Sequence, residues 1–309
     1  MPVPILESLG TAFLGRPLPD AAFELEPGRL TGLRPSGRGR PPRGRCVRPL
    51  TSGALAPSFD RPNLADAPAV RAAIDRAKDE LKLRSGTAAL LIPEPCVRNF
   101  ILAVEGMPAS GVERQAFLRW RVGKLMPLLP GDLRLASDAP AGAAAGRVMV
   151  SAAREAVIRE YEGLFEAAGM RVGAVTVPSL SLVNLVGVRP PANGLVLDIE
   201  PDCLSFLAFM DAAWTLYRQK AFGPDLSAEA RADLVVNEVE NTVHFLEDRE
   251  RRKVERVWVR SGTADEGPDV VSRLNEALPL AAEVIDYDAP GDWDAREKAA
   301  LAPLMGLIA

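Results

Sequence analysis

Apolar and polar positions follow two recurrent patterns along this chain. Runs of branched apolar residues predict strands, and apolar positions spaced by three or four residues predict amphipathic helices. Strands and helices alternate, which indicates an α/β protein. The predicted strands lie within 21–35, 86–108, 147–154, 170–187, 194–209, 212–222, 254–262 and 281–288. The predicted helices lie at 64–81, 110–127, 155–169, 227–250, 267–278 and 294–309, with one more at the end of 170–187.

Two segments predict β-hairpins. "AAFELEPGRLTGLRP" (21–35) alternates about a Pro-Gly pair, which is typical of a tight turn. "GLVLDIEPDCLSFLAF" (194–209) has an apolar strand that ends at Asp198, a polar turn and a second apolar strand. Because a hairpin rather than a helix follows the strand at 194–199, we expect a mixed sheet. Strand–Asp–turn elements often hold a phosphate, so the second hairpin is the first candidate for chemistry.

Composition excludes several classes of function. The chain has 309 residues and a formal net charge of −4, so the protein as a whole is no polyanion binder. Cys46, Cys96 and Cys203 lack metal-ligand spacing, and an odd number of cysteines fits a reducing compartment. His244 is the single histidine, which excludes a histidine-based triad or a zinc site of several histidines. No apolar run is long enough to span a bilayer and no signal pattern opens the chain, so we expect a cytoplasmic protein.

The segment "RPSGRGRPPRGRCVR" (34–48) is rich in Arg, Gly and Pro and contains no acidic residue. Glycine and proline disfavour regular structure, so we expect no core element here. One interpretation is a solvated loop. The other is a contact for acidic lipid headgroups or RNA, although no aromatic residue is present to stack on bases.

The order of several segments resembles the PilM family of type IV pilus assembly proteins and the related cytoplasmic domain of type II secretion L proteins. "VMVSAAREAVIREYEGLFEAAGMRVGAVTVPSLSLVNL" (148–185) is similar to that family's strand, helix, Ala-Gly turn, strand and helix. "LVLDIEPDCLSFLAF" (195–209) stands in the place of its second phosphate hairpin. "VNEVENTVHFLEDRERRKVERVWVRSG" (236–262) resembles its long helix and the strand that follows, and "FLRWRVGKLMPLLPGDL" (117–133) resembles an earlier helix and turn.

The resemblance implies an actin-like (ribonuclease H-like) two-domain α/β fold with mixed sheets. The first domain would span 1–188, with an inserted subdomain at about 86–146, and the second would span 189–309. In the family, a helical subdomain closes over the adenosine, but only 219–233 stands in its place here, so the second domain is reduced. The last helix, 294–309, is expected to pack back on the first domain.

The phosphate loops depart from the family pattern. In such loops an aspartate places the metal, and glycines let backbone N–H groups approach the phosphate. Asp198 stands at the aspartate position of the second hairpin, but Glu200 replaces the glycine and Asp202 adds a third carboxylate. In the first hairpin, Glu24 and Glu26 stand where the family has Asp-x-Gly. Each carboxylate costs on the order of 1–4 kcal/mol against a phosphate about 4 Å away, so we expect these cofactor-binding positions to be inactive.

A third departure is the turn Ser261-Gly262-Thr263, where the family has Gly-Gly. We therefore expect a protein that is not an enzyme, with no catalytic residue, no metal and no ATP or Mg²⁺ as cofactor. The alternative is a divergent actin-fold ATPase. The five carboxylates of the two hairpins would then hold Mg²⁺ together if the hairpins face each other.

An apolar row lies on the helix predicted from Ser110. Its members are Phe117, Leu118, Val122, Leu125 and Met126. The row is either core or part of a peptide-binding groove, because such grooves have apolar floors.

For the groove, the resemblance implies the short cytoplasmic peptide of a PilN-like bitopic inner-membrane protein as the partner. It also implies a cytoplasmic scaffold at the face of the inner membrane. Association with a pilus or secretion ATPase complex and self-association are further expectations, and nucleic acid is not an expected partner.

Overall fold

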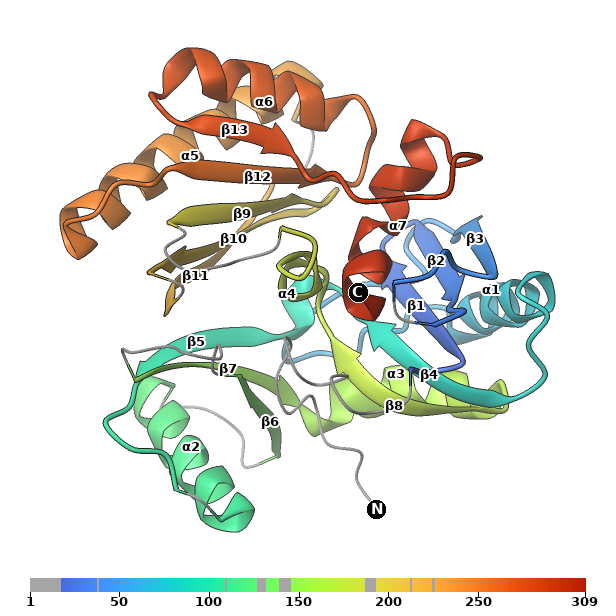
Figure 1. The fold of residues 1–309 in the computed structure, drawn as a ribbon. Helices are drawn as coiled ribbons and strands as arrows, with labels where there is room; N and C mark the ends of the chain where they lie inside the picture. Colours follow the sequence, from blue (N-terminus) through green and yellow to red (C-terminus); the bar gives the residue numbers. More distant parts are fainter. Residues whose placement is uncertain are drawn as a thin grey trace. The chain divides into compact units, whose positions relative to one another are not determined.

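The computed structural model describes residues 18–37, 39–108, 110–126, 132–138, 146–186, 193–211, 213–223 and 226–309 (Figure 1). The chain divides into two compact units, Met1–Val177 and Pro178–Leu307. Each unit has its own five-stranded mixed sheet. The domain boundary predicted at residue 188 falls outside the described residues.

The first unit is built on a sheet with the strand order β3-β2-β1-β4-β8. β1, β2 and β3 pair antiparallel, whereas β1–β4 and β4–β8 pair parallel. The predicted hairpin at 21–35 is confirmed as β1 and β2, with Gly28 of its turn at φ 88°. The strands are β1 (Ala21–Glu26), β2 (Arg29–Arg34), β3 (Gly44–Pro49), β4 (Gly86–Leu91) and β8 (Met170–Thr176).

Two helices pack in this unit, α1 (Ala67–Glu80) and α3 (Glu155–Ala167). The side chain of Asp66 caps α1 by accepting the Ala69 N–H at 3.0 Å. Four apolar side chains at helical spacing form the buried stripe of α1: Val70, Ala73, Ile74 and Ala77. α1 lies against β2 and β3, and α3 lies against β8.

A smaller antiparallel sheet with the order β5-β7-β6 completes the first unit. Its strands are β5 (Arg98–Ala103), β6 (Leu133–Asp138) and β7 (Arg147–Arg154), and α2 (Gly111–Leu125) packs against β6. A 3₁₀ turn (Glu94–Cys96) leads into β5. The insertion was expected at about 86–146, whereas this sheet spans 98–154, because β4 pairs with β1 and β8 of the main sheet.

The second unit repeats the arrangement of the first main sheet, with the strand order β11-β10-β9-β12-β13. β9, β10 and β11 form an antiparallel meander, and β12 and β13 follow in parallel. The strands are β9 (Gly194–Ile199), β10 (Cys203–Met210), β11 (Ala213–Ala221), β12 (Arg256–Ser261) and β13 (Ala281–Val284). The helices are α4 (Pro178–Leu182), α5 (Ala228–Glu250), α6 (Glu266–Ala277) and α7 (Ala295–Ile308).

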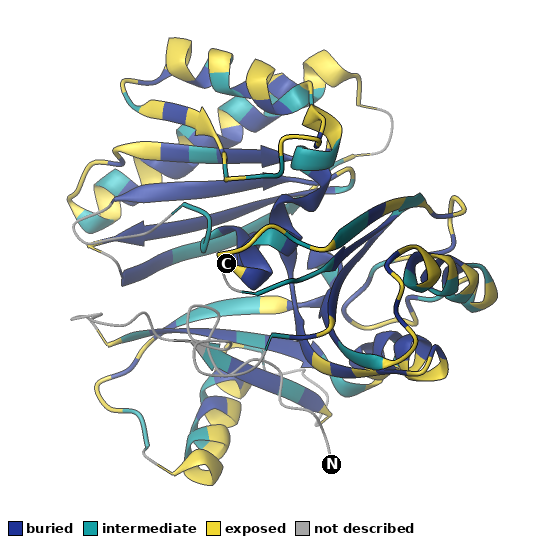
Figure 2. Cartoon of the chain, turned by 45° about the vertical axis from the view of Figure 1, so that its right-hand side comes forward, coloured by how far each residue is buried: buried dark blue, intermediate teal, exposed yellow. Residues whose placement is uncertain are grey.

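Side chains alternate between the two faces of this sheet. On one face, the apolar side chains of the odd positions of β9 and the even positions of β10 form a core with α5 and α6. Figure 1 shows α5 and α6 together on that side of the strands. The strands of both main sheets are largely buried, while the outer helix faces are exposed (Figure 2).

β11 ends at Ala221 and α5 begins at Ala228, so the connection runs over 222–227 only. A connection of that length has no room for a folded subdomain. None of the described helices is both long enough and apolar enough to cross a membrane.

The interpretation of 34–48 as a solvated loop was wrong for its second half. Residues from Gly44 onward form β3, which pairs with β2 alone and so lies at the sheet edge. An edge strand tolerates a sequence rich in charge and proline, because half of its backbone groups need no partner strand. β6 was also missed in the sequence.

α7 and α4 approach closely within the second unit. The Ser181 hydroxyl donates to the carbonyl oxygen of Pro303 at 2.9 Å, and the Asn184 amide donates to that of Gly306 at 2.8 Å. A Cβ atom at position 306 would lie 2.2 Å from the backbone oxygen of Ser181. Gly306 is therefore required by the separation of the two backbones.

Replacing Gly306 by alanine should lower the free energy of unfolding by about 1–3 kcal/mol, because the two backbones must move apart. Gly163→Ala is the matched control, since Gly163 is exposed on α3 and a Cβ there meets nothing within 4 Å. That change should instead raise stability by about 0.5–1 kcal/mol through helix propensity. Urea unfolding of both variants measures the difference, and equal effects of the two alanines would contradict the close approach.

Candidate functional site

The β9–β10 hairpin places its carboxylates on the sheet face opposite the α5–α6 core. Asp198 is fully buried and Glu200 is 5% exposed, whereas Asp202 is half-buried in the turn. Asp198 pairs in register with Ser205 of β10 and with Arg260 of β12. The sequence thus predicted the hairpin and the place of Asp198 in it correctly, but it did not predict Arg260 as the neighbour of Asp198.

Arg260 is the cation of this site. It is 2% exposed, and its Nη1 donates to Asp198 Oδ1 at 3.0 Å and also to a carboxylate oxygen of Glu200. Its Nε donates to the backbone oxygen of Ala299 in α7 at 3.1 Å. Two buried carboxylates therefore share one guanidinium, which supplies the positive charge at this place.

A proline makes the Ala299 carbonyl available. Pro303 lies inside α7 and has no N–H, so the oxygen four residues earlier receives no helical hydrogen bond. That oxygen belongs to Ala299, and Arg260 takes the place of the missing donor. The tyrosine next to this helix, Tyr287, donates to the Lys298 carbonyl at 2.7 Å, and burial raises the pKa of its hydroxyl even though Arg260 opposes the shift.

A second arginine fixes the turn from the other side. Arg231 of α5 donates to the backbone oxygens of Glu200 at 2.5 Å and Pro201 at 2.7 Å. Its Nε donates to Glu266 at 2.5 Å, and Glu266 also accepts the Ser261 hydroxyl at 2.6 Å. The hairpin turn is held by two arginines, one on its side chains and one on its backbone.

Three backbone N–H groups of these turns donate to acceptors within the unit. The Glu200 N–H donates to the Cys203 oxygen, and the Gly262 N–H donates to the Ile199 oxygen, both at 2.9 Å. The Thr263 N–H donates to the Ser261 hydroxyl at 3.1 Å. A phosphate at this place would have to displace these bonds, whereas phosphate-binding turns keep their N–H groups for the ligand.

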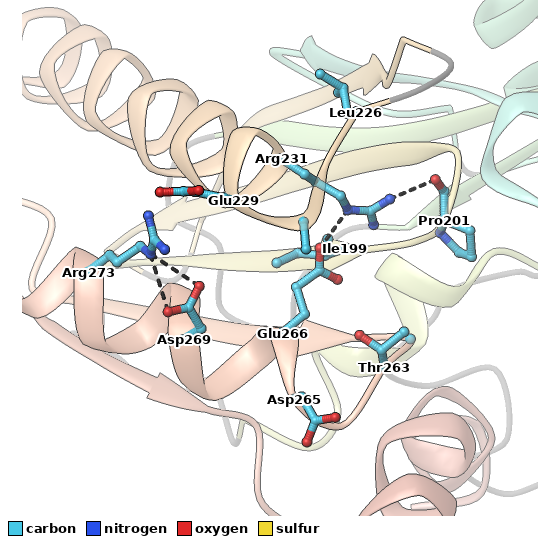
Figure 3. A pocket seen from close by; sticks show the side chains of 12 residues that line it. Ile199, Pro201, Leu226, Glu229, Arg231, Thr263, Asp265, Glu266, Asp269 and Arg273 are labelled. Atoms are coloured by element: carbon cyan, nitrogen blue, oxygen red, sulfur yellow. Dashed lines mark hydrogen bonds and ion pairs between the residues drawn. The ribbon is translucent and has the colours of Figure 1, made fainter.

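A pocket of about 630 Å³ adjoins the turn (Figure 3). Ile199 and Leu226 give it apolar surface, while four acidic and two basic side chains make it net negative. Both cations are engaged, since Arg231 pairs with Glu266 and Arg273 pairs with Asp269 at 3.1 Å and Asp233 at 2.6 Å. The charged residues of the lining are Glu229, Arg231, Asp265, Glu266, Asp269 and Arg273.

Glu24 and Glu26 lie on β1 in the first unit. The Thr31 hydroxyl donates to Glu24 at 3.3 Å, and Glu26 forms an ion pair with Arg29 across the Pro-Gly turn. Both carboxylates thus have partners within their own hairpin. The five-carboxylate cation site draws on hairpins of two separate units and stays a prediction.

The predicted apolar row of α2 divides into three environments. Leu118 and Val122 are fully buried in the core between α2 and the small sheet. Phe117 and Met126 are partly buried against the same core, and Leu125 is 56% exposed. Leu118 and Val122 are core residues. A peptide bound to this helix would therefore contact Leu125 and the exposed parts of Phe117 and Met126.

Arg260 was missed in the sequence, although a signal was present. It is a charged residue at a buried position of "VERVWVRSG", in a strand otherwise made for a core. A buried arginine needs anionic partners, and the end of β9 carries the acidic residues Asp198 and Glu200. The pairing of β9 with β12 was the missing information.

No family model matches the sequence, and no curated protein is similar to it at a significant level. Two solved structures show the fold. This chain is similar to the structure of a PilM-PilN type IV pilus biogenesis complex, with 16% identity and a TM-score of 0.77 over 99% of this chain and 98% of that one. It is also similar to a protein of unknown function with an actin-like ATPase fold from Bacteroides thetaiotaomicron, with 8% identity and a TM-score of 0.54 over 96% and 97%.

The protein therefore has the actin-like ATPase fold, as the resemblance implied. At these identities the similarity establishes the fold alone.

Replacing Arg260 by methionine should cost about 3–5 kcal/mol of stability, because two buried carboxylates lose their cation. The same replacement combined with Asp198→Asn and Glu200→Gln should recover most of that loss, since no uncompensated charge remains. Denaturant unfolding at neutral pH measures both variants. A single Arg260→Met variant as stable as the wild type would contradict the assigned role of Arg260.

Proposed function

We propose that this protein is a non-enzymatic scaffold at the cytoplasmic face of the inner membrane, in a type IV pilus or type II secretion assembly. Its partner would be the cytoplasmic peptide of a PilN-like membrane protein. Similarity to a PilM-PilN complex over 99% of the chain supports the setting. The single observation that carries the loss of ATPase activity is the buried pairing of Arg260 with Asp198 and Glu200.

Electrostatics disfavours a metal ion and a nucleotide at this site. In an actin-fold ATPase, an aspartate of the second hairpin has to place a metal next to the nucleotide phosphates. Here the corresponding Asp198 is fully buried and already neutralised by a guanidinium. A metal would have to displace Arg260 and leave a buried cation beside it, which is costly. The net negative pocket beside the turn adds repulsion toward a triphosphate.

The alternative function is a divergent ATPase with Mg²⁺ at the acidic turns. Retention of Asp198 at the metal-placing position of the hairpin favours it. It requires Arg260 to release its carboxylates when nucleotide binds.

Thermal unfolding with and without millimolar ATP and Mg²⁺ separates the two functions. The proposed scaffold should unfold at the same temperature under both conditions. An ATPase with nucleotide at a hundred times its dissociation constant gains about 2.7 kcal/mol, a rise of roughly 5–10 °C for a domain of 150–250 residues. ATP alone and Mg²⁺ alone are the controls, and a rise that needs both would establish the alternative.

Partner binding is tested on α2. Leu125→Ser should weaken binding of the N-terminal peptide of the organism's own PilN-like protein about tenfold, because burying a leucine contributes about 1.5–3 kcal/mol. Val112→Ser is the matched control on the same helix, since Val112 is 82% exposed and lies outside the predicted row. Fluorescence anisotropy with labelled peptide gives both affinities. Equal affinities for the two variants would exclude the row, and absence of binding to the wild type would exclude the partner.

A further inference from the structure

A concave basic site lies in the first unit, where the β2–β3 loop meets the end of α1. The cavity measures about 290 Å³. Four cationic side chains line it, Arg34, Arg43, Lys82 and Arg84, against the single carboxylate of Asp20. The concentration of positive charge is local, because the whole chain carries a net charge of −4.

The loop that forms one wall has internal support. It is the connection of the β2–β3 hairpin, closed by the Arg43 N–H, which donates to the Arg34 oxygen at 2.8 Å. The Ser36 hydroxyl donates to the Pro41 carbonyl at 2.5 Å. The described residues of the β2–β3 connection are thus held by hydrogen bonds within the connection itself.

Arg34 joins this loop to the opposite wall. Its Nη1 donates to the backbone oxygens of Leu81 and Lys82, at 3.2 and 3.3 Å. These oxygens belong to the C-terminal end of α1, which carries a partial negative charge. Arg34 therefore positions the two walls, and the other three cations are left for a ligand.

Lys82 occupies an unusual backbone position. α1 ends in a Schellman motif, in which the Lys82 N–H donates to Asp79 and the Leu83 N–H donates to Lys78. The motif puts Lys82 at φ 54°, a left-handed conformation in which glycine is the usual residue. The chain keeps a lysine there in spite of the backbone strain, and its side chain lines the cavity.

Arg43, Lys82 and Arg84 are exposed, and across the described part of the chain none of them pairs with a carboxylate. Asp20 is occupied, since its Oδ2 accepts both the N–H and the hydroxyl of Thr87, at 2.8 and 3.0 Å. Arg134 of the same unit differs, because it pairs with Glu155 and Glu162. The three cations are therefore available to an anion from outside.

We propose that this cavity binds the phosphate headgroup of an acidic phospholipid. Its volume suits a single phosphate-bearing group and not a strand of nucleotides. No aromatic side chain lines it, whereas single-stranded RNA binding depends on stacking. Clustered lysine and arginine side chains are attracted to anionic membrane surfaces. The inference concerns the first unit alone and does not depend on the proposed partner or on the nucleotide site.

Vesicle flotation with the full-length protein tests the proposal. The probes are phosphatidylcholine vesicles with and without phosphatidylglycerol, at low and at physiological salt. The wild type should bind only the anionic vesicles, and more weakly as salt rises. Combined replacement of Arg43, Lys82 and Arg84 by serine should weaken that binding at least tenfold.

The matched control replaces three exposed arginines of the same unit, Arg61, Arg76 and Arg171, by serine. It removes the same charge but leaves the cavity intact, so binding should fall less than threefold. Equal losses in the two variants would mean diffuse attraction and would overturn the site. Thermal unfolding of each variant without vesicles shows that the fold is retained.

Two further arms identify the occupant. If inorganic phosphate raises the unfolding temperature through these three residues but vesicles do not bind, the occupant is a soluble phosphate and the membrane assignment is overturned. If a labelled single-stranded RNA binds more tightly than anionic vesicles and with the same dependence on the three residues, the lipid assignment fails in favour of RNA.

Discussion

The structure of the second unit depends on one buried cation. Arg260 lies at the centre of a network that joins β9, β12 and α7, three elements that are separated in the sequence. Burying a guanidinium and two carboxylates carries a large desolvation cost, which the hydrogen bonds between them offset. The parallel register of β9 and β12 makes the pairing possible by setting Arg260 beside Asp198. Pro303 contributes because it leaves the Ala299 carbonyl without a helical donor, and Arg260 Nε donates to that carbonyl.

This network changes the meaning of the hairpin carboxylates. Asp198 and Glu200 look like ligands in the sequence, and in the structure they are the counter-ions of an internal arginine. The polar groups of the neighbouring turns also have partners within the unit. Arg231 donates to the carbonyl groups of the hairpin, and nearby N–H groups donate to acceptors in the same unit. The groups that would contact a ligand in a nucleotide-binding hairpin here form hydrogen bonds within the unit. The strand geometry of the hairpin supports this ion network.

Most of the fold could be predicted, because its elements have strong local patterns. The hairpins, the long helix α5 and the α3 segment follow from periodicity and turn residues. β3 could not be predicted, since an edge strand such as "GRCVRP" needs neither an apolar face nor a high strand propensity.

The candidate site could be predicted in part. Asp198 and Glu200 stand in a turn that the sequence pattern indicates, but Arg260 lies 60 residues after Glu200 and only the strand order of the sheet brings it near. In the α2 row, apolar spacing could not separate the buried Leu118 from the exposed Leu125, because the two residues are seven positions apart and lie on nearly the same helix face. They differ because Leu125 is the last residue of the helix.

The proposed loss of the nucleotide site would also constrain how such a protein acts. A ligand shifts a conformational equilibrium only as far as its affinity differs between the two states. If Arg260 permanently occupies the place of the metal, ATP and ADP provide no such difference, and a change of state must come from another ligand. The proposed recognition chemistry then consists of the surface of α2 and the basic cavity beside α1. Both lie in the first unit, whereas the ion network lies in the second. If the proposed function holds, the first unit carries the binding surfaces, while the hairpin carboxylates of the second unit are held by an arginine within the fold, which is the division expected of a scaffold rather than of a motor.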